Sequence, residues 1–538
     1  MSTWHGRILG IPWFALALLW VATTTAMQGC SGPSKPAPHY GGVLTYNRNL
    51  PDHGLDPWEV SSLADREIAE QIFEGLLQPD TSTFEPIPCL ADKWSVEDSG
   101  RTYIFHLRDG VRFQDNACFP NGLGREVTIE DVRYSFERNL RGPRLSWGAR
   151  ELRLLVGADA YLEGKTKHVS GIELRPPKTI VFHLRVPAHH FRYVFYSPAG
   201  YIIPKEAVDY YGDLFGRNPV GTGPFRLAFW NRVKLQLVRN DHYWGKDRAG
   251  NPLPYLGGVQ VLVGGRAIQN ADGFPPLLDV WMEVEVGFFN RFLRPSAEEN
   301  HVVLDSALMA ESAFLVVNFG RDGLLQKDRE LRRRFFAALN VEAARKAANG
   351  HAPLDGLLPE YFSGAMAVKD EDQLESTYLG EPGSSREAVF VHILSPDFPL
   401  DVLSYGPADE AFTNRKIGGF RFDLITKPER ADIWFVSHQW LFPDPEEVLR
   451  LFCSRFSPWG YANPEYDSLF VRFLAEHRRE KRLELASELV RILERDAAYQ
   501  PLFEEFNYYA WREYVRGFRK SINPFSYHFL KYVWLDSY

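Results

Sequence analysis

The residue types that catalysis and metal binding require are present in this sequence, but they do not stand at the spacings that those functions need. The 538-residue chain has no Gly-x-Ser-x-Gly nucleophile elbow, no phosphate-binding P-loop, no His-Glu-x-x-His helix and no clustered Cys-x-x-Cys pair. Adjacent acids occur at Glu283/Glu285 and Glu504/Glu505, a pattern more typical of a solvated face. The sequence therefore argues against an enzyme, although the acid pairs of glycosidases leave no sequence signature.

Two adjacent histidines, His189 and His190, are the other group that could carry chemistry. Neighbouring side chains of a strand point to opposite faces, and no acid or cysteine lies nearby at metal-ligand spacing. We interpret both histidines as surface residues, and we expect neither a metal nor another cofactor.

The bulk composition is that of a large globular protein. Hydrophobic residues make up 45% and charged residues 24% of the chain, and this length predicts two or three domains. The net charge of −8, without a long basic run, disfavours a nucleic-acid partner.

The first 29 residues have the pattern of an export signal. Arg7 precedes an uncharged, mostly apolar stretch, and a Gly-Cys junction at Cys30 leads into a Pro/Ser-rich tether over residues 30–40. The junction resembles the site at which bacterial lipoproteins are cleaved and acylated on the cysteine. The apolar stretch is also long enough to remain as an uncleaved membrane anchor.

Three elements along the chain have clear local signals. Residues 43–47 are predicted as a strand, and Thr128 is predicted to cap a helix with Asp131 at its third position. Alternating apolar residues predict a hairpin over 103–113 that turns at Asp109-Gly110. Because Cys89 and Cys118 flank this hairpin, they are the candidate disulfide pair of an exported protein.

The segment 218–245 is the most distinctive part of the sequence. A stiff Gly/Pro turn leads into two short strands, 225–230 and 233–238, and an aromatic group follows them. The whole pattern resembles the extracellular solute-binding proteins of peptide and nickel ABC importers, the family of oligopeptide- and dipeptide-binding proteins. The matching residues are Gly221, Thr222, Gly223, Pro224, Phe225, Trp230, Arg239, Asn240, Tyr243, Trp244 and Gly245.

The resemblance implies an α/β fold of two lobes, with mixed sheets flanked by helices and an extra peripheral subdomain. Lobe I would combine residues 41–84, 222–308 and 500–538. The peripheral subdomain would span 85–221, and lobe II would span 309–499.

The resemblance also implies where a ligand would bind. Strand ends near the Leu-Asp-Pro motif and before Pro443-Asp444-Pro445 face the ligand in this family. The ligand-binding residues implied here are Tyr46, Asn47, Arg48, Asn49, Ser437, His438, Gln439 and Trp440. Replacing Trp440 by alanine is accordingly expected to weaken ligand binding and to leave the fold intact. The family's acid for the α-ammonium group of a peptide falls on Leu441, so a free peptide with a charged N-terminus is a less certain ligand.

The function implied is that of a monomeric lipoprotein outside the cytoplasm, held at the membrane by its lipid anchor. It would capture a peptide or another small solute and deliver it to the permease and ATPase of an ABC importer. A sensor or scaffold lipoprotein on the same fold is the main alternative, and an extracellular hydrolase is a remote one.

Overall fold

One mixed sheet of twelve strands organises the part of the chain that the structure describes. The computed structural model describes residues 37–60, 62–142, 147–263, 273–339, 341, 352–354, 356–358, 389–394, 415–417, 420–425, 431–440, 443–518 and 529–536. The strands of the sheet, in spatial order, are β15 (Arg415–Ile417), β16 (Phe420–Ile425), β14 (Val389–Leu394), β17 (Ile433–Gln439), β12 (Val302–Val317), β18 (Tyr499–Arg512), β11 (Val280–Trp281), β1 (Val43–Asn47), β10 (Gly258–Leu262), β9 (Lys234–Arg239) and β8 (Phe225–Trp230), with β13 (Ala352–Pro353) paired to β18.

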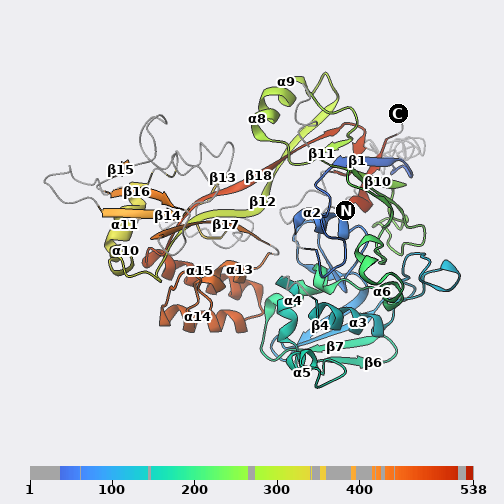
Figure 1. Ribbon diagram of the computed structural model, residues 1–538, viewed down its shortest axis with the longest axis horizontal. Helices are drawn as coiled ribbons and strands as arrows, with labels where there is room; N and C mark the ends of the chain where they lie inside the picture. Colours follow the sequence, from blue (N-terminus) through green and yellow to red (C-terminus); the bar gives the residue numbers. More distant parts are fainter. Residues whose placement is uncertain are drawn as a thin grey trace, which may run out of the picture. The chain divides into compact units, whose positions relative to one another are not determined.

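The longest strands, β12 and β18, run side by side through the middle of this sheet (Figure 1). They are antiparallel and paired from Val302–Arg512 to Val316–Tyr499, with register shifts between Leu308 and Ser312 and between Ala313 and Phe314. On one side β12 pairs with β17, and on the other side β18 pairs with β11, which lies parallel to β1. The two strands therefore connect the β14–β17 group to the β1–β8–β10 group.

Alternation along β12 places its side chains in two different cores. Phe314 and Val316 belong to the main core, whereas Ala313, Leu315 and Val317 belong to a second cluster. The second cluster includes Phe335 and Phe336 of α11 (Arg329–Ala338), and the main core includes Leu489 of α15 (Arg479–Arg495). Because side chains of a strand alternate between its faces, this pattern buries β12 on both sides.

A separate sheet of four antiparallel strands carries the aromatic core of the region predicted as the peripheral subdomain. Its order is β4 (Ala91–Glu97), β5 (Thr102–Leu107), β7 (Thr179–His183) and β6 (Ile172–Arg175). The prediction of a hairpin that turns at Asp109-Gly110 is therefore wrong. The partners of β5 are β4 and β7, and the described residues after the turn do not pair with it. The predicted cap is confirmed: Thr128 and Asp131 form a capping box at the start of α3 (Ile129–Leu140).

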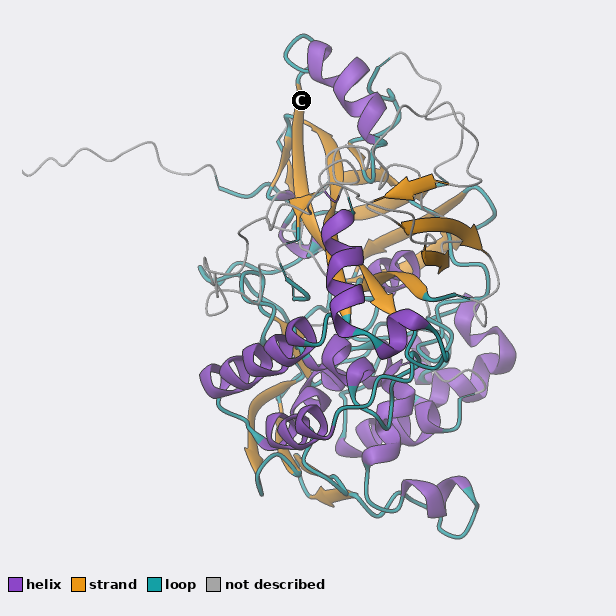
Figure 2. Ribbon diagram, turned by 90° about the vertical axis from the view of Figure 1, so that its left-hand side faces the viewer, coloured by secondary structure: helices purple, strands orange, loops and turns teal. Residues whose placement is uncertain are grey.

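The helices are mostly short, and Figure 2 shows them in purple. Besides α3, α11 and α15, the α-helices are α2 (Leu63–Ala69), α4 (Trp147–Glu151), α5 (Ala158–Leu162), α6 (Lys205–Tyr211), α8 (Val286–Phe288), α9 (Arg294–Ser296), α10 (Leu324–Lys327), α13 (Glu446–Leu449) and α14 (Pro464–Ala475). A 3₁₀ helix, η3, spans His189–Tyr196. Residues 40–538 form one compact unit, and the lobe boundaries remain a prediction. The predicted signal segment 1–29 lies outside the described residues.

Sequence motifs that lie far apart in the chain meet at the buried carboxylate of Glu74. It accepts hydrogen bonds from Thr222 Oγ1 (2.9 Å), Tyr243 Oη (2.7 Å) and Trp244 Nε1 (2.9 Å). The Gly/Pro turn packs directly on the chain before Glu74: a Cβ added to Gly221 would lie 2.2 Å from the carbonyl oxygen of Ile72. Only glycine fits at this approach. The segments 73–76 (Phe-Glu-Gly-Leu), 221–224 (Gly-Thr-Gly-Pro) and 243–245 (Tyr-Trp-Gly) therefore depend on one another.

A second pair of motifs is joined by an ion pair. The carboxylate of Asp56, in the Leu-Asp-Pro turn, accepts two hydrogen bonds from the guanidinium of Arg138 at 2.7 and 2.6 Å. Both groups are buried, and the guanidinium also lies over the Trp58 ring. This bidentate pair holds the turn after β1 against α3.

Candidate ligand-binding site

The first predicted binding segment lies at the carboxyl end of β1. Strands β10 and β11 run parallel to β1, so the carboxyl ends of all three meet at one edge. In open α/β sheets, ligands bind outside the carboxyl ends of the strands. Residues 46–49 therefore lie where a ligand is expected for this kind of sheet.

Most side chains of this segment are already engaged within the protein. Tyr46 is buried, and the amide of Asn47 exchanges hydrogen bonds with the backbone of Met282 at 2.8 and 3.1 Å. Arg48 makes a bidentate pair with Glu67 of α2 (2.7 and 2.8 Å) and a second ion pair with Glu283. Asn49 is exposed.

The electrostatics of Arg48 follow from these contacts. Burial opposes its charge, but the facing carboxylates outweigh burial and raise the pKa of the guanidinium. Glu283, at the other end of the pair, has a φ of 53°, an uncommon conformation for a residue with a Cβ. The segment thus forms a rigid polar edge in which Asn49 presents the accessible side chain.

The second predicted segment lies at the carboxyl end of β17. Ser437 is exposed and its hydroxyl donates to Glu311 Oε1 of β12 at 2.6 Å. His438 is half-buried, with Nε2 3.6 Å from Glu447 Oε2. Only the backbone of Gln439 is described, as the last residue of β17, and Leu441 lies outside the described residues.

Trp440 is a core residue in this structure. Its side chain is 0% exposed, and Nε1 donates to Ser312 Oγ of β12 at 3.0 Å. Because the indole is fully buried, we now expect alanine at this position to destabilise the fold. The His438 ring packs edge-on against the indole, with centroids 5.0 Å apart, and so lies between Trp440 and the surface.

The two predicted segments belong to one sheet but are not in direct contact in the described structure. Strands β11, β18 and β12 lie between β1 and β17. Both strand ends exist in the structure, but the sequence did not indicate that acids of the intervening strands lie between them. Glu311 and Glu505 are such residues, and Glu504, assigned from sequence to a solvated face, is buried.

Glu505 on β18 has a carboxyl group whose pKa is raised by its surroundings. Burial, together with the negative charge of Glu311, raises the pKa of its carboxyl to about 7. Protonation is therefore favoured in the folded state, and the folded protein loses stability as pH rises from about 4.5 to about 7. Above that range Glu505 is charged, and burial of the charge beside Glu311 destabilises the folded protein to its full extent.

We predict that Glu505→Gln stabilises the protein at about pH 8 by about 1–2 kcal/mol, after allowance for solvent screening of this half-buried group, and has little effect at about pH 4.5. Urea unfolding at the two pH values measures the difference. Glu488→Gln, on an exposed position of α15, is the matched control and should be neutral at both. Equal effects of Glu505→Gln at both pH values would contradict the assignment.

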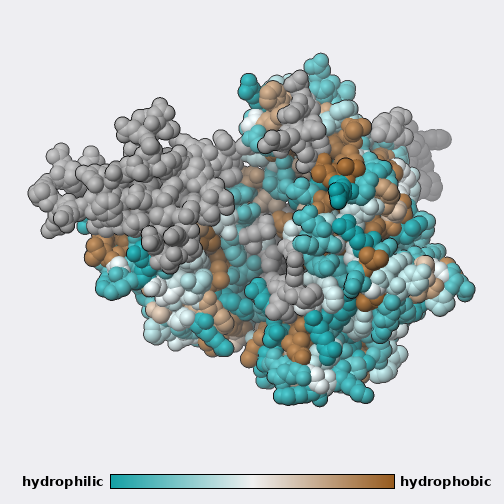
Figure 3. Space-filling view, viewed as in Figure 1, coloured by the Kyte–Doolittle hydropathy of each residue, from teal (hydrophilic) through white to brown (hydrophobic). Residues whose placement is uncertain are grey.

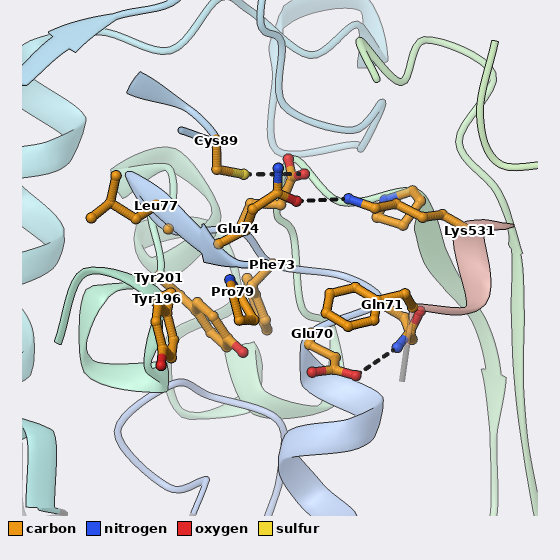
Figure 4. A pocket seen from close by; sticks show the side chains of 14 residues that line it. Glu70, Gln71, Phe73, Glu74, Leu77, Pro79, Cys89, Tyr196, Tyr201 and Lys531 are labelled. Carbon is orange, nitrogen blue, oxygen red and sulfur yellow. Dashed lines mark hydrogen bonds between the residues drawn. The ribbon is translucent and has the colours of Figure 1, made fainter. Parts of the chain in front are cut away.

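The predicted disulfide between Cys89 and Cys118 is not formed. Both are free thiols, as is Cys453. Cys89 lies in the buried cluster around Glu74, with Sγ 3.6 Å from Glu74 Oε1 (Figure 4), and burial raises the pKa of this thiol. Cys118 belongs to a loop, where its backbone N–H donates to Asn116 Oδ1. The prediction failed because the flanking hairpin on which it rested does not exist.

A small cavity opens beside Glu74, lined in part by Phe73, Tyr196, Tyr201 and Lys531 (Figure 4). The volume of this cavity is about 60 Å³. That is room for a few waters, and a peptide does not fit. The face shown in Figure 3 is largely hydrophilic, with apolar residues in small separate groups.

The adjacent histidines are not surface residues, contrary to the sequence-based interpretation. They lie in η3, with exposed fractions of 7% and 3%. His189 Nδ1 lies 3.1 Å from Asp444 Oδ2, and the two ring nitrogens of His190 each lie 2.8 Å from a carboxylate, of Glu151 and of Glu446. The missing signal was tertiary, because these acids lie far from the histidines in sequence. Within the described residues, no group of three or more His, Cys, Asp and Glu side chains could hold a metal ion.

Solved structures with the same fold are two-lobed binding proteins. The unliganded open form of the periplasmic murein tripeptide-binding protein MppA has a TM-score of 0.74 at 18% identity, covering 94% of this chain and 99% of that chain. DppA from Helicobacter pylori, in complex with the peptide STSA, has a TM-score of 0.67 at 20% identity, covering 93% and 99%. The fold is therefore the two-lobed α/β fold of periplasmic binding proteins, as predicted.

Sequence comparison identifies the family. The model of the bacterial extracellular solute-binding proteins, family 5, matches residues 85–383. The periplasmic oligopeptide-binding protein OppA of Escherichia coli is 22% identical over 516 residues, 88% of this chain and 89% of that protein. The dipeptide-binding protein of the same organism is 32% identical over 186 residues, which cover 32% of this chain and only 33% of that protein. The chain belongs to the bacterial extracellular solute-binding proteins of family 5.

Among the described residues, no helix has the length and apolar character needed to cross a membrane.

Proposed function

We propose that this protein captures a peptide-like solute between two lobes and presents it to the permease and ATPase of an ABC importer. The observation that carries the proposal is the family match, together with relatives and structural neighbours whose names describe peptide binding. A ligand held by both lobes binds the closed arrangement better than the open one, and this difference in affinity drives closure. The protein binds its solute without altering it.

The lobes in this proposal are those that the sequence indicated. Lobe I contributes the carboxyl end of β1, where Asn49 is exposed. Lobe II contributes the end of β17, where Ser437 is exposed and His438 is half-buried. Arg48 and Trp440 act behind these residues, as supports. Position 441 is leucine, so no acid there can pair with the charged amino terminus of a peptide. This favours a solute whose recognition does not require such a group.

We further propose that the protein works outside the cytoplasm as a monomer and that an acyl group on Cys30 holds it at the membrane. The Gly-Cys junction and the Pro/Ser-rich tether support this anchor. Mass spectrometry of the amino-terminal peptide from the host membrane tests it: an acylated Cys30 is expected, and an unmodified chain that begins with Met1 would contradict it.

The capture function predicts a co-purifying solute and a compaction on binding. Native mass spectrometry of the exported protein should show a peptide-sized mass that unfolding releases. Removing this solute should increase the radius of gyration in X-ray scattering, and adding it back should restore the smaller value. A protein that shows no compaction with its solute, or that converts the solute to products, would contradict the proposal.

A further inference from the structure

A buried network of charges joins two parts of the chain that the large sheet does not connect directly. On one side are α4 and η3, from the region predicted as the peripheral subdomain, and on the other are α13 and α15 (Figure 1). The members of the network are His189, His190, Glu151, Asp444, Glu446, Arg450 and Arg482. We call this set the seam.

His190 is the centre of the seam and carries a positive charge. Its Nε2 faces Glu151 and its Nδ1 faces Glu446, both at 2.8 Å. A carboxylate can only accept hydrogen bonds, so both ring nitrogens must be protonated for both contacts to be favourable. Burial acts against this charge, yet Glu446 and Glu151 outweigh burial and raise the pKa of His190 to about 9.

Arginines complete the seam on both sides of His190. Arg482 donates to Asp444 and to Glu446, both at 2.9 Å, and is buried with them. Arg450 bridges the two parts, reaching Glu446 at 2.9 Å and Glu151 at 3.1 Å. Three carboxylates, Glu151, Asp444 and Glu446, thus face three cations, and the seam is electrically balanced.

His189 occupies the seam in its neutral form. Its Nδ1 lies 3.1 Å from Asp444 Oδ2. In the neutral ring the proton is on Nδ1, and this N–H donates a hydrogen bond to the carboxylate. Burial lowers the pKa of His189 to about 4. The titratable and charged groups around the two histidines are Glu85, Tyr103, Glu151, Arg192, Tyr193, Asp444, Glu446, Arg450 and Arg482.

The free energy needed to separate two surfaces is smaller for a contact of balanced ion pairs than for an apolar contact. The desolvation of buried charges offsets most of their attraction, so the pairs gain little free energy from burial and water can replace the lost partners. An apolar contact of the same size would expose hydrophobic surface and resist separation. The chemistry of the seam therefore suits a contact that forms and breaks repeatedly.

We propose that the seam is the contact that forms and breaks between the peripheral subdomain and lobe II as the protein closes and opens. This proposal rests on the capture function above, which requires closure. It gives the histidine pair a role in setting the balance between the two states, without any contact with solute.

The seam makes this balance depend on pH in a defined direction. His190 has an ordinary pKa near 6.5 when open and about 9 in the formed seam, so closure takes up a proton. The stabilisation is complete below about pH 6.5 and is lost as pH rises through about 9, a change on the order of a hundredfold in the equilibrium constant. His189 acts oppositely at low pH: its stabilisation is present above about pH 6.5 and is lost toward about pH 4.

Distances between spin labels, measured by pulsed electron resonance without solute, test the proposal. Labels at Glu163→Cys and Glu488→Cys, both exposed positions, report on the two sides of the seam. The labelled protein also carries Cys30→Ser and Cys118→Ser, so that the label attaches only at the two chosen positions. Cys89 and Cys453 can stay because both are buried. The expected result is a short distance whose population is larger at about pH 6.5 than at about pH 9.5.

Two variants and a control complete the experiment. His190→Gln and Arg450→Gln should each favour the long distance at both pH values. Arg450 is 30% exposed, so its replacement is expected to disturb the fold less than that of His190 and keeps the test decisive if His190→Gln fails to fold. His168→Gln removes an exposed histidine of the same region, paired with Glu137, and should behave as the parent protein does.

A distance distribution that neither pH nor the two variants change would overturn the proposal and make the seam a permanent contact. This result is distinguishable from a failure of the capture function, since that failure would be seen as a protein that binds no solute. The spin-label experiment uses no solute and reads only the contact itself.

Discussion

Replacing Glu74 with alanine is expected to lower the free energy of unfolding by about 3–5 kcal/mol. The carboxylate accepts hydrogen bonds from Thr222, Tyr243 and Trp244, and the Cys89 thiol lies against it. Without it, buried donors from three separate segments lose their common acceptor. Each loss is larger than that of an ordinary hydrogen bond because the acceptor is charged.

Urea unfolding, monitored by circular dichroism, measures this effect. Glu74→Gln keeps the volume and one acceptor oxygen, so its effect should lie between those of alanine and the parent. Glu488→Ala, at an exposed position, is the control and should stay within about 0.5 kcal/mol of the parent. If Glu74→Ala were as stable as this control, the buried carboxylate would not organise the motifs around it.

Replacing Trp440 with alanine is expected to destabilise the protein by about 3–5 kcal/mol, whether or not solute is present. The indole is fully buried, and its removal leaves both a cavity and Ser312 Oγ without its donor. Trp440→Phe should recover most of the packing and leave mainly the loss of one hydrogen bond, about 1 kcal/mol.

The same unfolding assay, together with solute affinity, separates the two roles that Trp440 could have. Tyr210→Ala, which truncates an aromatic residue that is 61% exposed, should be close to neutral. A Trp440→Ala protein of parental stability that had lost only its solute affinity would restore the sequence-based view of this residue as a ligand contact.

Strands and helix caps that depend only on residues close together in the sequence were predicted well. The strand over 43–47 is β1 and the strand over 225–230 is β8, with the same bounds. The Thr128 cap needs only residues within one helical turn. The predicted strand over 233–238 is β9, which lies one residue later, at Lys234–Arg239.

Pairings between distant segments could not be predicted in this way. Asp109-Gly110 is a good turn chemically, yet β5 takes its partner β7 from more than 70 residues further along the chain. Likewise, His189 and His190 looked exposed because the acids that pair with them come from α4 and from the start of α13. Nothing in a single sequence marks which acid meets which histidine.

For the candidate site, the resemblance pointed to two strand ends that exist in the structure, at β1 and β17, but not to the state of their side chains. Arg48 and Trp440 are polar or aromatic residues near the strand ends that the resemblance implies as ligand-facing, and for that reason they were predicted to bind ligand. The structure shows that their partners lie within the chain, at Glu67 and Ser312. Burial of this kind depends on packing, which sequence patterns describe only on average.

The position of β18 has a consequence for how the protein is made. This strand comes from residues 499–512, yet it lies between β12 and β11 in the middle of the large sheet. During synthesis the earlier strands cannot complete their pairing until β18 has emerged, and contacts of such long sequence separation form slowly. The chain is therefore expected to stay incompletely folded while it is being made, which leaves time for translocation before the sheet closes.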